Sequence, residues 1–107
     1  MLTPDLQKQI ALAIKALEPE KIILFGSHAY GATHQDSDID LLVIKNIPPE
    51  KVKEFRLLVR KILWEKFKGQ GKGFDVLVDS PDRIEERISL GDLFYDEIIK
   101  KGKVIYA

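Results

Sequence analysis

The stretch that decides the fold lies between two short apolar segments, and residues 26–43 read GSHAYGATHQDSDIDLLV. It follows the apolar run 21–25 and leads into a second one at residues 39–45. Short, β-branched apolar runs broken by glycine are typical of buried strands. We therefore expect two strands joined by a small, polar segment that begins at Gly26.

Two aspartates stand at the start of the second expected strand. Asp38 and Asp40 are two residues apart, so strand alternation puts both carboxylates on one face, about 7 Å apart along the backbone. Carboxylate oxygens are the ligands that Mg²⁺ prefers. Two such ions can bridge the phosphates of a nucleotide and an attacking oxygen. The pair is therefore a candidate metal site.

The end of the first expected strand has the chemistry of a phosphate site. Gly26 lets the backbone approach a ligand closely. Residues 27–30 could form one helical turn whose free N–H groups favour phosphate oxygens, and the Ser27 hydroxyl is a further donor. If the first two strands are antiparallel, Gly26 and Ser27 share one site with the aspartates.

The remaining pattern predicts helices and strands in alternation. Helical periodicity or apolar runs indicate a helix from residue 4 to Pro19, a helix over 50–68, a strand over 74–78, helices over 81–89 and 92–101, and a strand over 103–106. This order predicts an α/β (α+β) domain, a small mixed β-sheet with helices packed on it. A crossover helix between the second and third strands favours their parallel pairing.

A third carboxylate can join the same site. Asp75 is the second residue of the third expected strand, so parallel pairing brings it level with Asp38 and Asp40. It could accept the proton of an attacking hydroxyl or ligate a metal. Asp79 alternates to the same face as Asp75, but it stands at the other end of the strand. We therefore prefer Asp75.

Composition limits the class of protein. The chain has 107 residues, no cysteine, and 17 basic against 17 acidic residues. We expect one domain over residues 1–107, without a disulfide scaffold or a thiolate site. Zero net charge argues against a nucleic-acid or anionic-lipid partner, because the chain as a whole does not attract a polyanion. The longest apolar run, residues 10–14, is five residues, far below the about 20 of a membrane span. The N-terminus lacks a secretory pattern, so we expect a cytoplasmic protein.

The run Gly-Ser, ten residues, Asp-x-Asp and then hydrophobic residues resembles the signature of the DNA polymerase β-type nucleotidyltransferase superfamily. The short chain is similar to the minimal nucleotidyltransferases, which are often the antitoxins of HEPN-domain toxins. The resemblance covers nearly the whole chain and implies a nucleotidyltransferase fold. It implies a Mg-dependent protein adenylyltransferase that moves AMP from ATP to a hydroxyl, such as a toxin tyrosine, and releases pyrophosphate.

Carried over to this sequence, the resemblance assigns Gly26 and Ser27 to the triphosphate, Asp38 and Asp40 to two Mg²⁺ ions, and Asp75 to the third carboxylate. Many relatives carry arginine directly after Gly-Ser and again two residues later, where this chain has His28 and Tyr30.

The roles of these substitutes stay open. His28 either contacts phosphate or a partner or is solvated, and Tyr30 either stacks on a base or packs the loop. We expect His34 to be solvated. Two other functions also remain: a catalytically silent antitoxin that neutralises its toxin by binding alone, and a nucleotidyltransferase acting on RNA or a small-molecule hydroxyl.

The long expected helix carries apolar residues on two sides. Its predicted core face comprises Val52, Phe55, Leu58, Val59, Ile62, Leu63 and Phe67. Leu57 and Trp64 point away from that face, among the basic residues Lys53, Arg60, Lys61 and Lys68. This second stripe indicates either a surface for the toxin or a second copy, or an area covered by the C-terminal helices.

Overall fold

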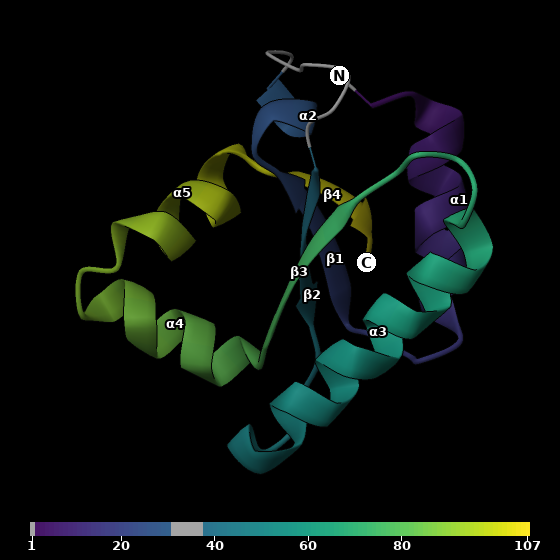
Figure 1. The fold of residues 1–107 in the computed structure, drawn as a ribbon. Coiled ribbons are helices and arrows are strands. Elements are labelled where there is room, and N and C mark those ends of the chain that lie inside the picture. Colours follow the sequence, from purple (N-terminus) through teal and green to yellow (C-terminus); the bar gives the residue numbers. More distant parts are fainter. Residues whose placement is uncertain (1, 31–37) are drawn as a thin grey trace.

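The computed structural model describes residues 2–30 and 38–107, so His34 lies outside the described residues. Figure 1 shows the arrangement of the elements. In chain order they are α1 (Pro4–Lys15), β1 (Lys21–Phe25), α2 (Ser27–Tyr30), β2 (Ile39–Ile44), a 3₁₀ turn (Pro49–Lys51), α3 (Val52–Phe67), β3 (Phe74–Asp79), α4 (Pro81–Ser89), α5 (Leu93–Lys101) and β4 (Lys103–Tyr106). The expected order of helices and strands is confirmed.

The strands form one mixed sheet in the order β3-β2-β1-β4. β1 pairs antiparallel with β2 on one side and with β4 on the other. β2 pairs with β3 in parallel, and α3 makes the crossover between them. Both predictions of strand direction are therefore correct, and the strands that carry the aspartates are neighbours.

Helices cover both faces of the sheet (Figure 1). α1 and α3 pack on one face, over a buried cluster that includes Ile22, Leu41 and Val59. α4 and α5 lie on the opposite face, over a smaller cluster with Phe25 and Leu42. No helix in the described part of the chain is long and apolar enough to cross a membrane.

Side-chain caps explain where three helices begin. Thr3 accepts a hydrogen bond from Leu6 N at 3.2 Å, and Ser80 accepts one from Arg83 N at 3.2 Å. Asp92 accepts from the amides of Phe94 and Tyr95 at 3.0 and 3.1 Å. Each cap satisfies amides that the first helical turn leaves without partners. The expected helix over 92–101 accordingly has Asp92 as its cap.

The predicted helix faces need two corrections. Leu58 is 45% exposed and is no part of the core, because α3 buries the narrower stripe Phe55, Val59, Leu63 and Phe67 against the sheet. On α1, the buried face is Gln7, Ile10, Ala11 and Ile14. The helix expected from residue 4 to Pro19 ends at Lys15, and Leu17, which lies beyond this end, still packs against the core cluster.

The second stripe of α3 is open to solvent. Leu57 is 51% exposed and Trp64 is 64% exposed. Of the two alternatives, cover by the C-terminal helices is therefore wrong, because α4 and α5 lie on the other side of the sheet (Figure 1). The alternative of a partner surface stays a prediction.

Candidate active site

The strand register brings the candidate residues to one end of the sheet. Asp40 is paired with Phe25 of β1 on one side and with Asp75 of β3 on the other. The Gly26 bend directly follows Phe25, and Asp38 directly precedes β2. The backbone amide of Ile39 donates to the carbonyl of Gly73 at 2.9 Å, which ties the start of β2 to the approach of β3.

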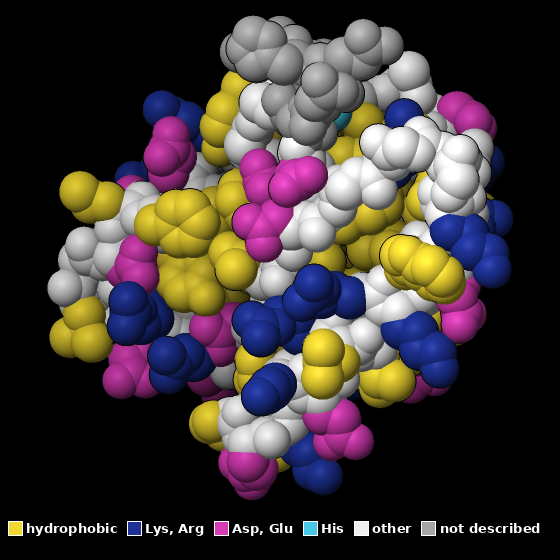
Figure 2. All heavy atoms as spheres, viewed as in Figure 1, with side chains coloured by type: hydrophobic (Ala, Val, Ile, Leu, Met, Phe, Trp, Pro, Cys, Tyr) yellow, Lys and Arg dark blue, Asp and Glu magenta, His cyan; other side chains and the backbone are white. Residues whose placement is uncertain are grey.

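Alternation decides which face the carboxylates occupy. Ile39 and Leu41 belong to the core cluster beneath α1 and α3, so Asp40 between them faces the α4–α5 side. Asp75 precedes Val76 of the same cluster and faces the same side. Figure 2 shows a group of acidic side chains near the beginnings of β2 and β3, beside a hydrophobic area.

Two glycines make room for the carboxylates. Gly26 has a φ of +73°, and a Cβ there would collide with the Asp40 carboxylate, lying 3.1 Å from its Cγ. A Cβ at Gly73 would collide with the carboxylate of Asp38. Gly26 is therefore required by conformation and by contact, and the Gly-Ser bend and the aspartate pair are directly adjacent.

The bend continues into the short helix α2. The amides of Ala29 and Tyr30 donate to the Gly26 carbonyl at 3.0 and 3.2 Å, which closes the predicted helical turn. The His28 carbonyl accepts from Leu2 N at 3.1 Å, so the N-terminal segment holds the turn in place. Ser27 begins the helix, next to Gly26 and the carboxylates.

The carboxylates repel one another. The pKa of Asp40 is raised above its usual value of 3.8, first by burial and then by the negative charges of Asp75 and Asp38. His28 acts in the opposite direction, so it lies within electrostatic reach of Asp40. Carboxylates that repel one another in this way are suited to a cationic ligand, because a bound cation relieves the repulsion.

A cavity of about 390 Å³ opens beside these carboxylates. It is lined by Phe25, Gly26, Tyr30, Asp40, Asp75, Leu77, Phe94, Glu97 and Ile98. The Phe94 ring stands edge-on to Phe25, with centroids 5.8 Å apart. Such a mixture of aromatic walls and a few polar groups is typical of small-molecule pockets.

Sequence reasoning missed the cavity residues of α5. Phe94 and Glu97 lie more than fifty residues after the aspartate pair, and no spacing relates them to it. The pattern of residues 92–101 predicted a helix, but periodicity does not say which part of the sheet that helix covers.

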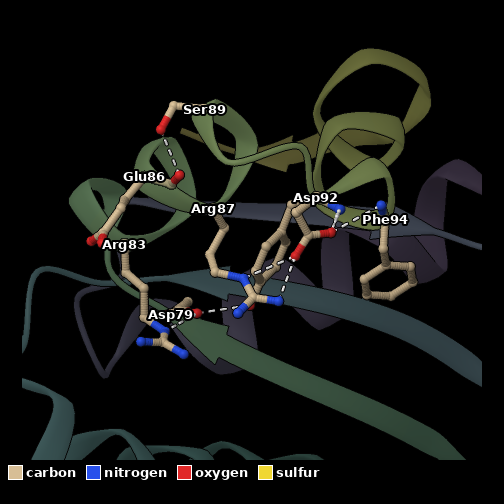
Figure 3. Close-up of polar contacts among 8 residues, drawn as sticks. Asp79, Arg83, Glu86, Arg87, Ser89, Asp92 and Phe94 are labelled. Carbon is tan, nitrogen blue, oxygen red and sulfur yellow. Dashed lines mark hydrogen bonds and ion pairs between the residues drawn. The ribbon is translucent and has the colours of Figure 1, made fainter.

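Asp79 lies at the far end of β3, as expected, and is engaged in a structural network. It is 5% exposed and accepts from Tyr95 Oη at 2.7 Å and from Arg83 Nε at 3.1 Å (Figure 3). It also accepts from the Ser80 amide at 3.0 Å. These bonds fasten α4 and α5 to the sheet. Asp79 therefore belongs to the scaffold, and Asp75 is the carboxylate at the site.

The acidic side chains do not converge on one point. Over residues 2–30 and 38–107, no three His, Cys, Asp or Glu side chains are grouped closely enough to hold a metal ion. The register places Asp40 and Asp75 side by side, while the Asp38 side chain lies against Gly73. The carboxylates are thus neighbours in an open arrangement.

Comparisons with known proteins agree with this geometry. The family model described as a nucleotidyltransferase domain matches residues 7–106. A relative from Methanocaldococcus jannaschii, provisionally named a protein adenylyltransferase, is 30% identical over 87 residues, covering 81% of this chain and 78% of the relative. A crystal structure of a toxin-antitoxin with AMP-PNP shares the fold at 18% identity, with a TM-score of 0.53 over 94% of this chain and 73% of that one. This chain therefore belongs to the nucleotidyltransferase domain family.

Proposed function

We propose that this chain transfers AMP from ATP to a hydroxyl of a partner protein, a tyrosine of a cognate HEPN toxin, and thereby acts as its antitoxin. The observation that carries the proposal is the register of Asp40, which lies between the Gly26 end of β1 and Asp75 of β3. The provisional name of the M. jannaschii relative and the AMP-PNP in the toxin-antitoxin neighbour support it.

The residues divide between binding and proton transfer. Gly26 and Ser27 hold the triphosphate at the bend, and the cavity beside Tyr30 and Phe94 receives the rest of the nucleotide. Asp75 accepts the proton of the acceptor hydroxyl. The acceptor oxygen then bonds to the α-phosphorus as the bond to pyrophosphate breaks. Positioning and electrostatic stabilisation supply most of the rate.

In this proposal Asp38, Asp40 and Asp75 would hold two Mg²⁺ ions, because their carboxylates stand at one end of the sheet and offer the oxygen ligands that Mg²⁺ prefers. Their open arrangement means that the side chains would have to turn toward a common point to do so. Such ions supply charge neutralisation at the phosphates. In this proposal residues 1–107 work as one minimal nucleotidyltransferase domain, in the cytoplasm, where ATP is available.

The test incubates the protein with α-labelled ATP, Mg²⁺ and the product of the neighbouring gene. We expect label on that protein, and we expect it to disappear in the double variant Asp38→Asn/Asp40→Asn. Asp82→Asn is the matched control, because Asp82 is an exposed carboxylate on α4, far from the bend.

Three other results would each replace the proposal. Neutralisation of the partner by the double variant, without any label, would identify a silent antitoxin that acts by binding. Label on added RNA or on a small molecule would identify a different acceptor. Label on the partner that survives the double variant would move the chemistry to other residues.

A further inference from the structure

The helix α5 forms one wall of the cavity beside the carboxylates. It contributes Phe94, Glu97 and Ile98, which are three and four residues apart and therefore share one side of the helix. The sheet supplies another wall, which carries Asp40 and Asp75. The cavity thus extends from the carboxylates to a helix wall that the proposed triphosphate and metal sites do not use.

Phe94 offers an aromatic surface in a fixed position. The residue is 53% exposed, and its ring stands at 85° to the ring of Phe25. Its amide donates to the Asp92 carboxylate at 3.0 Å, and Arg87 Nε donates to the same carboxylate at 3.0 Å (Figure 3). A ring that is held at its backbone and half open to solvent is suited to stacking with a flat ligand.

Glu97 is the polar residue of this helix wall. It follows Phe94 by three residues, so the two Cβ atoms lie about 5–6 Å apart on the helix surface. Its ion pair with Lys101, at 3.7 Å, joins two exposed side chains and contributes little to stability. The ionised carboxylate therefore keeps acceptor oxygens for a ligand, and it has no hydrogen to donate.

The order of the groups in a nucleotide matches the order of the groups along the cavity. In the proposed function the triphosphate lies at the Gly26 bend, and the ribose separates it from the base. Phe94 contacts Phe25, the residue before the bend, so its ring is within reach of a nucleotide whose phosphates lie at Gly26. The cavity of about 390 Å³ is near the lower end of the range for small-molecule pockets, which fits one such ligand.

We propose that Phe94 stacks on the base of the nucleotide and that Glu97 accepts a hydrogen bond from the N6 amine of adenine. This inference rests on the proposed function, because it names the residues that select the base in the same nucleotide site. Adenine has the N6 donor where guanine and hypoxanthine have the O6 acceptor. In the same pose O6 would face the Glu97 carboxylate, and two acceptors repel each other. The site therefore selects ATP over GTP and ITP.

A ribose hydroxyl is the other donor of a nucleotide that could meet Glu97. The position of Glu97 beside the aromatic ring favours the amine, because a ligand stacked on Phe94 has its base next to that ring. The ribose lies one bond further toward the phosphates, and thus toward the sheet wall. The ligands used below distinguish these two donors.

The first test changes the ligand and leaves the protein intact. Calorimetric titration in Mg²⁺ compares the β,γ-imido analogues of ATP, ITP and 2′-deoxy-ATP. We expect the ATP analogue to bind about tenfold more tightly than the ITP analogue, because the carbonyl of hypoxanthine leaves the carboxylate unpaired. A preference for the ribose over the 2′-deoxyribose, without a preference for the amine, would assign Glu97 to the ribose and overturn the proposal.

The variant Glu97→Gln identifies the group that selects the base. An amide can donate to a carbonyl as well as accept from an amine, so the preference for the ATP analogue should fall by about fivefold or more. Asp96→Asn is the matched control. Asp96 makes the same kind of ion pair on the same helix, with Lys100 at 3.0 Å, and is not among the described residues that line the cavity. It should keep the full preference.

The variant Phe94→Leu separates stacking from base selection. Leucine keeps the wall apolar but has no flat face, so both the ATP and the ITP analogue should bind about tenfold more weakly, with the preference between them retained. Leu93→Ala is the matched control, because Leu93 is exposed and does not belong to the described cavity lining. Far-UV circular dichroism checks that all four variants fold.

Four results would overturn the base site. They are no binding of the ATP analogue, equal binding of the ATP and ITP analogues, a preference that Glu97→Gln leaves unchanged, and a loss in Phe94→Leu no larger than that in Leu93→Ala. The proposed function is judged separately. Selection of the ATP analogue without AMP transfer to any protein would keep the base site and reject the adenylyltransferase. Transfer to the partner protein from ATP and ITP at equal rates would keep the proposed transfer and reject the base site.

Discussion

At the scale of single residues, the contact between Gly26 and Asp40 joins the two halves of the site. The Asp40 carboxylate occupies the space that any side chain at position 26 would need. The bend and the Asp40 carboxylate are thus fitted to each other, and a change at Gly26 should disturb Asp40.

Replacing Gly26 tests this contact. Gly26→Ala should lower stability by about 1–2 kcal/mol, through its positive φ and the collision with Asp40, and should abolish AMP transfer. Gly69→Ala is the matched control, because Gly69 also has a positive φ, of 81°, but its Cβ would meet no atom within 4 Å. Thermal unfolding and label transfer are measured for both. Equal losses of activity in the two variants would show that the contact between Gly26 and Asp40 has no special importance for AMP transfer.

Replacing Asp40 should make the metal-free protein more stable. Asp40→Asn removes a partly buried charge and its repulsion from Asp75 and Asp38, and we expect a gain of up to about 1 kcal/mol, since water screens this partly exposed group. The folded-state pKa is raised, so the penalty on the wild type is present at neutral pH. It fades as the pH falls through that pKa toward 3.8 and below.

The measurement is thermal unfolding in a chelator at neutral and acid pH. Mg²⁺ should then raise the unfolding temperature of the wild type more than that of Asp40→Asn. A variant that is less stable than the wild type at neutral pH would show that the carboxylate cluster is not strained.

The sequence was sufficient to predict that the aspartates and the Gly26 bend lie at the same end of the sheet. Strand alternation and the crossover rule decide this, because the strands concerned are neighbours. It could not predict Phe94 and Glu97, because their place beside the site depends on how α5 packs across the sheet. The open arrangement of the three carboxylates also depends on side-chain positions that no spacing encodes.

At the scale of elements, α3 presents two different apolar faces. The buried face of Phe55, Val59, Leu63 and Phe67 holds the sheet, and the exposed face carries Leu57 and Trp64. Because the second face makes no contribution to the core, it can be changed without unfolding the domain.

The free energy of unfolding of the double variant Leu57→Asp/Trp64→Ala should therefore stay within about 0.5 kcal/mol of the wild-type value. It should weaken the complex with the partner protein, or self-association if the chain is oligomeric. Size-exclusion chromatography at matched concentrations measures this. The corresponding core variant, Leu63→Ala, should lose about 2–5 kcal/mol and serves as the contrast. An unchanged complex would reject this face as a partner surface.

The helix α5 is anchored from the opposite end of β3. Its Tyr95 hydroxyl donates to the buried Asp79, and burial together with the Asp79 carboxylate raises the pKa of Tyr95 well above its usual range. The hydroxyl therefore stays protonated and keeps donating. The same helix places Phe94 in the cavity wall, so the hydrogen bond of Tyr95 also helps to position that wall.

Tyr95→Phe should lower stability by about 1–2 kcal/mol, because the mutation removes one donor from a buried carboxylate. It should also weaken ATP binding by loosening the cavity wall, with little effect on the chemical step. Tyr106→Phe, on β4, is the control for loss of a phenol. Calorimetric titration with a nonhydrolysable ATP analogue measures the affinity. An unaltered affinity would show that the hydrogen bond between Tyr95 and Asp79 does not position the cavity wall.

At the scale of the whole molecule, the order of elements and the direction of the strands followed from the pattern of apolar runs and the length of the crossover. The packing of the last two helices did not follow from it. An amphipathic pattern shows that a helix packs on another element, but it does not say which face of the sheet the helix covers. For the same reason the sequence left open whether the C-terminal helices cover Leu57 and Trp64, and the structure shows that they do not.

The parallel pairing of β2 with β3 also orders the assembly of the protein in time. β1 and β2 can meet early as near neighbours in sequence, whereas Asp75 joins Asp40 only after the intervening segment has folded back across the sheet. A partly synthesised or locally opened chain therefore holds two carboxylates without the third. The proposed site is complete only when the crossover is folded, so a bound nucleotide should slow hydrogen exchange throughout the crossover.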